Sequence, residues 1–222
     1  MRLHDIVNTL QNDPFVIKPF RYRHSHVSSR AHFKGGIKAF MKSDDTPTFS
    51  KKDGGYNGGA AREAATYQFA QILGLGYLVP PTVLRMVDGK PHSLQLWAYW
   101  LSGCESYNAK INYGSPAFRD LLFLDCIIAN NDRHQGNFLV LPPNRVRAID
   151  NAYTFPTDQA HYSPKYSNPQ SKKPLSRRHI RILTTHLSSP TWKAPLLTLL
   201  GEDAVRETEN RMQNMLEDRV YV

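Results

Sequence analysis

One continuous stretch, from Leu121 to Phe155, constrains the fold of this chain more than any other. Its first third is apolar nearly all round, which predicts a helix in the interior of a domain. A polar loop follows, and then two short apolar segments, the first at 138–141 and the second ending at Asp150, with Pro-Pro-Asn between them. Proline and asparagine favour a tight turn, so the second segment can return beside the first as a hairpin. The chain must therefore pack a buried helix near a hairpin, with a polar loop joining them.

The polar loop concentrates acidic, basic and amide side chains. It reads Asn-Asp-Arg-His-Gln-Gly-Asn and ends at Asn137, and a hydrophobic-Asp step follows thirteen residues later at Asp150. Phosphoryl transfer needs a carboxylate that orients the attacking hydroxyl and accepts its proton, together with an amide and a second carboxylate that hold Mg2+ against the phosphates. A lone Asp-Arg-His would be an ordinary solvated turn. The apolar helix before it and the carboxylate at the end of a strand favour a functional site instead.

This pattern resembles the catalytic and metal-binding loops of the kinase superfamily. The nearest branch is the phosphatidylinositol 3-/4-kinase-like and HipA-like one, whose members write the loop Asp-Arg-His or Asp-x-His. The resemblance implies ATP and Mg2+ as cofactors, Asp132 as the catalytic base, and Asn137 with Asp150 as metal ligands. It also implies that Arg133 and His134 brace the loop.

A short strand with two lysines is predicted after the turn Gly35-Gly36. The segment 37–42 reads Ile-Lys-Ala-Phe-Met-Lys, and alternation places Lys38 and Lys42 on the same face of the strand. In a kinase, one lysine here holds the α- and β-phosphates of ATP, a task suited to a compact cation on a long stem. The resemblance favours Lys42, because HipA-like relatives commonly place this lysine after a small-aromatic-aliphatic run. Lys38 remains the alternative, because alternation alone does not separate the two.

Two further segments complete the kinase-like pattern. The segment 26–31 stands where the resemblance places a phosphate-covering loop. It lacks Gly-x-Gly-x-x-Gly, so Ser28 and Ser29 are the candidate donors to phosphate, through hydroxyl and backbone groups. A helix predicted at 60–73 carries Glu63 one turn in, where kinase-like folds place the glutamate that pairs with the strand lysine. Without the resemblance, Glu63 would be an ordinary partner of the helix dipole.

The order of elements predicts an α+β chain with a minimal two-lobed protein-kinase-like fold. A small β-rich lobe with one helix spans 1–100 and covers the nucleotide, and a mainly helical lobe spans 101–222 and carries both loops. Further helices are predicted at 1–12, 116–129, 176–187, 192–200 and 203–219, strands at 15–33, 82–87 and 93–100, and polar loops at 43–59 and 157–174.

The chain of 222 residues is strongly basic, with a net charge of +9 and a pI of about 9.6. Such a charge favours anionic partners, including nucleotides, acidic proteins, phospholipid headgroups and nucleic acid, without choosing among them. With 41% hydrophobic residues the chain can bury a core, which argues against wholesale disorder. Its two cysteines, Cys104 and Cys126, suit a reducing compartment, and it shows no signal peptide or apolar run of membrane-spanning length. We therefore expect a protein that is cytoplasmic or delivered into a host cytosol.

These motifs leave the acceptor of the phosphoryl group open. We expect a Ser or Thr hydroxyl of a protein, because the chain is shorter than typical lipid-kinase domains. A phosphoinositide or small-molecule hydroxyl, or transfer of AMP in place of phosphate, are the alternatives. A non-enzymatic alternative is a basic RNA- or DNA-binding protein, which the pI and the mixed aromatic and cationic residues of 15–33 favour. Its binding would depend on salt and would survive loss of Asp132 or Asp150.

Overall fold

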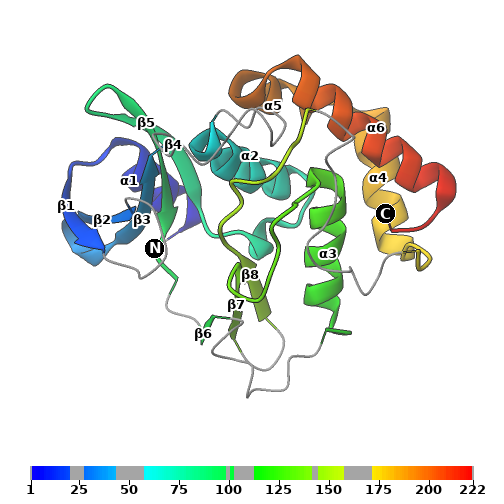
Figure 1. Ribbon diagram of the computed structural model, residues 1–222, viewed down its shortest axis with the longest axis horizontal. Coiled ribbons are helices and arrows are strands. Elements are labelled where there is room, and N and C mark those ends of the chain that lie inside the picture. Colours follow the sequence, from blue (N-terminus) through cyan, green and yellow to red (C-terminus); the bar gives the residue numbers. More distant parts are fainter. Residues whose placement is uncertain are drawn as a thin grey trace.

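The computed structural model describes residues 2–20, 28–43, 58–98, 101–102, 113–141, 145–157 and 172–221. Within these ranges the chain forms two parts (Figure 1). An antiparallel sheet lies at the left of the view, and most of the helices lie at the right. One helix and a small hairpin lie between them.

The first part is built around a five-stranded antiparallel sheet in the order β1-β2-β3-β5-β4. Its strands are β1 (Phe15–Phe20), β2 (Ser28–Phe33), β3 (Lys38–Ser43), β4 (Thr82–Val87) and β5 (Lys90–Leu96). The turn from β2 to β3 contains Gly35 and Gly36, both in a left-handed conformation that glycine adopts without strain. This tight turn fixes the register in which Lys42 on β3 lies opposite Ser28 on β2.

Alternation along the strands gives this sheet two different faces. One face packs against helix α1 (Leu3–Asn12), and its buried core consists of Leu10, Ala31, Phe33, Ala39, Met41, Val83 and Leu94. The other face carries Lys38, Phe40 and Lys42 of β3. Helix α2 (Gly59–Ile72) packs against β4 and β5 on the side of Lys42.

The second part has helix α3 (Pro116–Ile128) at its centre. The hydroxyl of Ser115 caps its first turn, and almost all of the helix after that turn is buried. Helices α4 (Arg177–Ser188), α5 (Lys193–Leu200) and α6 (Glu202–Asp218) lie around it, with a small sheet of β6 (Leu101–Ser102), β7 (Phe138–Leu141) and β8 (Arg145–Ala148). Phe69 of α2 contacts Phe155 and Trp192 edge to face, so α2 belongs to the core of this second part as well.

The predicted α+β architecture, with a β-rich part followed by a mainly helical part, is confirmed. The predicted helices have close counterparts in α1 to α6. The segment 15–33 forms two paired strands instead of one, with Phe15 opposite Phe33. The lobe boundary near residue 100 stays a prediction. The Pro-Pro-Asn turn, residues 26–27 of the predicted phosphate loop, and most of the predicted loops at 43–59 and 157–174 lie outside the described residues.

Across the ranges given above, no helix combines the length and the apolar character that crossing a membrane requires.

Candidate active site

Lys42 and Glu63 meet where β3 faces α2. The Nζ atom of Lys42 donates to Oε1 of Glu63 at 2.7 Å, and Glu63 is buried while 26% of the Lys42 side chain is exposed. A buried carboxylate requires such a partner, because an isolated charge in the interior is costly. Lys38 lies four residues earlier on the same strand face, opposite His32. The geometry therefore singles out Lys42 as the lysine next to the glutamate of α2.

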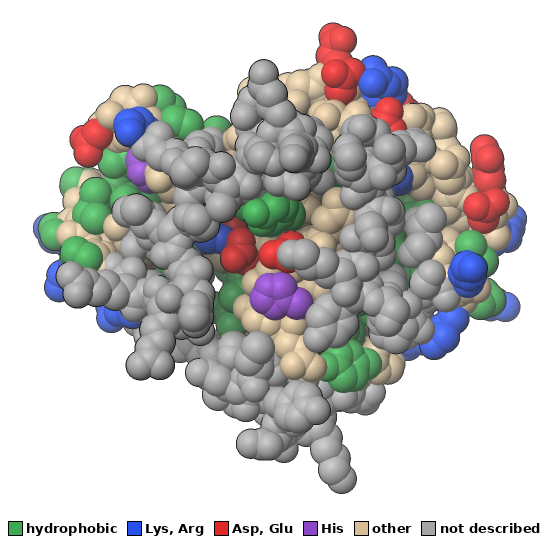
Figure 2. Space-filling model, viewed as in Figure 1, with side chains coloured by type: hydrophobic (Ala, Val, Ile, Leu, Met, Phe, Trp, Pro, Cys, Tyr) green, Lys and Arg blue, Asp and Glu red, His purple; other side chains and the backbone are tan. Residues whose placement is uncertain are grey.

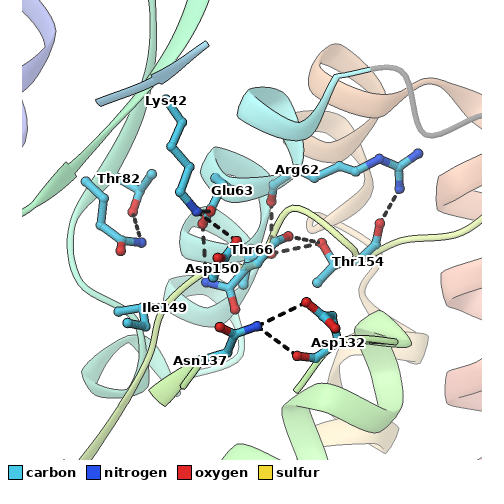
Figure 3. Close-up of polar contacts among 12 residues, drawn as sticks. Lys42, Arg62, Glu63, Thr66, Thr82, Asp132, Asn137, Ile149, Asp150 and Thr154 are labelled. Atoms are coloured by element: carbon cyan, nitrogen blue, oxygen red, sulfur yellow. Dashed lines mark hydrogen bonds and ion pairs between the residues drawn. The ribbon is translucent and has the colours of Figure 1, made fainter. Parts of the chain in front are cut away.

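Lys42 also contacts Asp150, which follows β8 in the second part. Nζ lies 2.8 Å from Oδ1 of Asp150 (Figure 3). Burial alone would lower the pKa of Lys42, but attraction to Asp150 and Glu63 and hydrogen bonds to both raise it above its ordinary value. The positive charge of Lys42 in turn lowers the pKa of Asp150, against the effect of burial. At neutral pH, Lys42 is therefore a cation and Asp150 an anion.

The predicted catalytic loop begins where α3 ends. Ala129 adopts a left-handed conformation that ends the helix, and Oδ1 of Asn130 then accepts a hydrogen bond from the backbone N–H of Asp132 at 2.9 Å. The side chain of Asn137 closes the loop. Its Nδ2 atom donates to the backbone oxygen of Asp132 at 2.8 Å and to Oδ2 of the same residue at 3.3 Å. Asp132 and Asn137 are thus held side by side.

The β7–β8 hairpin brings Asn137 and Asp150 to the same end. The strands pair antiparallel with Phe138 opposite Ala148, and the backbone N–H of Ile149 donates to the carbonyl of Asn137 at 3.0 Å. Asp150 has a φ of 54°, a left-handed conformation that aspartate adopts more readily than most residues. The backbone therefore leaves the extended conformation of the strand at this residue. In Figure 3, the side chains of Asp132, Asn137 and Asp150 lie together below Lys42.

Arg133 is the buried support of this loop. Its guanidinium forms a two-point pair with Asp125 of α3, with Nε to Oδ2 and Nη2 to Oδ1 both at 3.0 Å. The same group donates to the backbone carbonyls of Asn137 and Ile149 and, at 2.6 Å, to Oδ1 of Asn151. One side chain therefore connects α3 to the adjacent ends of β7 and β8, where the candidate metal ligands lie.

His134, Ser28 and Ser29 complete the predicted set. The His134 side chain is 44% exposed, with Nε2 3.9 Å from Oδ2 of Asp132 and Nδ1 accepting from the backbone N–H of Gly136 at 3.0 Å. Ser28 lies opposite Lys42 in the ladder between β2 and β3. Ser29 lies opposite Met41, whose side chain joins the core under α1, so alternation places the Ser29 side chain on the face away from Lys42.

Three residues outside the predicted set also contribute to this arrangement. Asp125 pairs with Arg133, and Asn151 donates from Nδ2 to Oε2 of Glu63 at 3.5 Å. Arg62 of α2 donates to backbone carbonyls of the segment that follows Asp150. A signal for Asp125 was present, since a carboxylate inside an otherwise apolar helix needs a buried partner. The sequence carries no comparable signal for Arg62.

Asn137 and Asp150 are the residues that could hold a metal ion. Mg2+ prefers oxygen ligands and is commonly held by one or two carboxylates together with substrate phosphates and water. The Asp150 side chain is 46% exposed, so its carboxylate can take a partner besides Lys42. Asn137 turns its amide nitrogen to Asp132, which directs its oxygen to the other side (Figure 3). The pair fits a cation that is shared with a phosphate group.

Charged side chains of both signs gather between the two parts of the molecule. Figure 2 shows acidic side chains next to Lys or Arg, with a histidine close by, at the centre of this face. A surface with both signs of charge can bind a polyanion together with a divalent cation. A uniformly cationic surface would attract the polyanion and repel the divalent cation.

The fold of this chain is similar to that of solved kinases. No protein-family model and no curated protein matches its sequence. The Golgi casein kinase with Mn and ADP bound has a TM-score of 0.64 at 14% identity, over 97% of this chain and 74% of that one. A second structure of the Golgi casein kinase has a TM-score of 0.63 at 14% identity, over 97% and 73%. The Helicobacter pylori proinflammatory kinase CtkA has a TM-score of 0.52 at 11% identity, over 96% and 94%. The predicted kinase-like fold is confirmed, and the branch of the superfamily stays a prediction.

Proposed function

We propose that this chain is a kinase that uses ATP and Mg2+ to phosphorylate a Ser or Thr hydroxyl of a protein. The observation that carries the proposal is the position of Lys42, whose Nζ atom is 2.7 Å from Glu63 and 2.8 Å from Asp150, beside a loop that presents Asp132 and Asn137. This arrangement unites a cation for phosphates, an oxygen pair for a metal, and a carboxylate for the attacking hydroxyl. Those are the groups that phosphoryl transfer requires.

Each of these side chains has a distinct role in the proposed reaction. Lys42 stays protonated because its pKa is raised, and it would hold the α- and β-phosphates while the buried carboxylate of Glu63 keeps it in place. Asn137 and Asp150 would hold Mg2+, which when bound neutralises charge on the phosphates. Asp132 would orient the acceptor hydroxyl and take its proton.

A surface suited to a planar base lies on the same sheet face as Lys42. The rings of Phe40 and Trp97 are 6.2 Å apart, and the guanidinium of Arg30 lies 4.6 Å from the centre of the Trp97 ring. The backbone N–H of Trp97 donates to the carbonyl of Lys38 at 2.8 Å, which fixes the aromatic residue beside β3. Aromatic and guanidinium planes are common stacking partners of nucleotide bases, which supports ATP as the nucleotide.

The choice of a protein acceptor has one support. Two of the solved structures with a similar fold are named Golgi casein kinase, and casein is a protein. The order Asp-Arg-His in the loop is the support for placing the chain in the phosphatidylinositol 3-/4-kinase-like and HipA-like branch.

The test is phosphate transfer by the purified chain. Incubation with γ-labelled ATP, Mg2+ and a cell extract should label protein bands, and Asp132→Ala and Asp150→Ala should abolish the label while circular dichroism shows an intact fold. Asp218→Ala, at the exposed end of α6, is the matched control and should keep the wild-type rate. Label in the lipid fraction would show that the acceptor is a lipid and not a protein. Transfer of label from α-labelled ATP would show that AMP is transferred and not the phosphoryl group. A wild-type chain without transfer, whose nucleic-acid binding is salt-dependent and survives both substitutions, would refute it.

A further inference from the structure

We infer that Arg62 is a positioning residue that ties α2, and with it the Lys42–Glu63 pair, to the segment that follows Asp150. The inference rests on the proposed function and deepens it. Arg62 and Glu63 are neighbours in α2, and successive side chains of a helix point about 100° apart. Glu63 pairs with Lys42 of β3 and touches residues 151–155, named here the 151–155 segment, only at Asn151, whereas Arg62 donates to Thr154 and Phe155 at the end of that segment.

The contacts of Arg62 are buried and directed at backbone. The residue is 4% exposed, and its Nη1 atom donates to the carbonyl oxygen of Thr154 (Figure 3) and to that of Phe155. Hydrogen bonds from a charged donor are stronger than neutral ones, and a buried guanidinium that lost these acceptors would leave its charge poorly solvated. Arg62 therefore resists separation of α2 from this segment.

Two more side chains on the Arg62 face of α2 contact the end of the same segment. Thr66 Oγ1 lies 3.2 Å from Thr154 Oγ1, and the rings of Phe69 and Phe155 meet edge to face at 5.9 Å. Positions 62, 66 and 69 follow the i, i+4, i+7 spacing of a single helix face. One face of α2 thus contacts the end of the 151–155 segment, while Glu63, one position off this face, pairs with Lys42 through Oε1 and accepts from Asn151, at the start of the segment, through Oε2 at 3.5 Å.

The 151–155 segment is also held by the end of α3 and by the catalytic loop that follows it. The backbone N–H of Phe155 donates to the carbonyl of Ile128 at 2.6 Å, and that of Asn131 donates to the carbonyl of Tyr153 at 3.1 Å. Asp150 before the segment and Phe155 at its end both have left-handed φ values, which cost free energy for residues other than glycine. The segment keeps this shape because α2, the end of α3 and the catalytic loop all contact it. Arg62 therefore helps to set the position of Asp150 relative to Lys42.

The experiment compares Arg62→Met with Arg211→Met. Arg211 is a second buried helix arginine that donates to a backbone carbonyl, from Nε to Ile127 at 2.7 Å, and it lies in α6. Both substitutions remove a buried guanidinium, so both should lower the melting temperature. Three measurements follow on each protein: amide hydrogen exchange of peptides covering the 151–155 segment, binding of Mn2+ with ADP by calorimetry, and the Mg2+ dependence of the rate. Arg62→Lys is the conservative variant, since it keeps the charge and donors.

Arg62→Met should speed exchange in the 151–155 segment and weaken metal binding by about 10- to 100-fold, the range for residues that support metal ligands. The Mg2+ concentration at half-maximal rate should rise by the same factor, the KM for the acceptor should stay unchanged, and Arg62→Lys should recover most of the loss. Arg211→Met should show neither effect. Equal effects in both Met variants, or faster exchange with unchanged metal binding, would overturn the inference. A wild-type chain that transfers no phosphate would refute the proposed function, and the exchange and calorimetry would still decide the role of Arg62.

Discussion

Replacing Asp125 with Asn would leave the guanidinium of Arg133 buried without a carboxylate partner. Removing one member of a buried ion pair costs about 3–5 kcal/mol, because arginine cannot shed its proton. Two features place the expected loss of unfolding free energy near the lower end of this range. Asn keeps one acceptor oxygen for Arg133, and burial already raises the pKa of Asp125 against the influence of Arg133, so the charged carboxylate is itself disfavoured. We therefore expect a loss of about 3 kcal/mol, which corresponds to a melting temperature lower by about 6–12 °C for a chain of this size.

The same substitution should reduce activity, because Arg133 also holds the carbonyls of Asn137 and Ile149. A loss of about 10- to 100-fold in rate is expected, as for other residues that support metal ligands. Urea unfolding and phosphate transfer from labelled ATP measure the two effects. Asp120→Asn is the control, since Asp120 is buried in the same helix and its partners are Tyr77, His179 and Arg178, away from the loop. Equal loss of activity in both variants, or an Asp125→Asn protein as stable as wild type, would refute the reasoning.

Two further predictions concern charge and the nucleotide. Because Lys42 lowers the pKa of Asp150, the stability that Asp150 contributes is present above its unfolded pKa of about 3.9 and is lost as pH falls through the lower folded value. The difference in unfolding free energy between wild type and Asp150→Asn should therefore be constant from about pH 5 to 8 and shrink below about pH 4. Urea unfolding at a series of pH values measures this difference, and a change between pH 6 and 8 would contradict the prediction. Trp97→Ala should weaken ATP binding by about 1–3 kcal/mol, or roughly 5- to 150-fold, if the base stacks there. An unchanged affinity for ATP, measured by calorimetry, would show that Trp97 does not contact the base.

Hydrophobic periodicity predicted most of the elements because each of them buries one face. In α4 and α6, for example, which were predicted at 176–187 and 203–219, Leu183, Met212 and Met215 lie in the core. The segment 15–33 was predicted as one strand and forms β1 and β2, and residues 28–31 of the predicted phosphate-covering loop lie in strand β2. No Gly, Pro, Asn or Asp occurs between Phe20 and Phe33, and serine, which does occur there, is a weaker turn signal than these four.

Local spacing also explains which parts of the site could be predicted. Asn137 and Asp150 are joined by one hairpin, so their proximity follows from the strand pattern between them. The choice between Lys38 and Lys42 could not be made from alternation, because both lie on one strand face and the deciding partner is Glu63, 21 residues away. Arg62 was beyond reach for the same reason, since its carbonyl acceptors are more than 90 residues away in the chain.

The buried charges around the site are better explained by positioning than by stability. Arg62, Glu63, Asp125 and Arg133 are all buried, although well-packed apolar residues of similar volume often stabilise a fold as well or better. An apolar set could not fix where the carbonyl of Asn137 or the ammonium of Lys42 lies, because dispersion contacts have no direction. Arg133 donates to that carbonyl and Glu63 accepts from that ammonium, while Asp125 holds Arg133 and Arg62 holds the segment after Asp150. Catalysis of phosphoryl transfer consists almost entirely of positioning and electrostatic stabilisation, so the proposed function accounts for the desolvation cost of these buried groups.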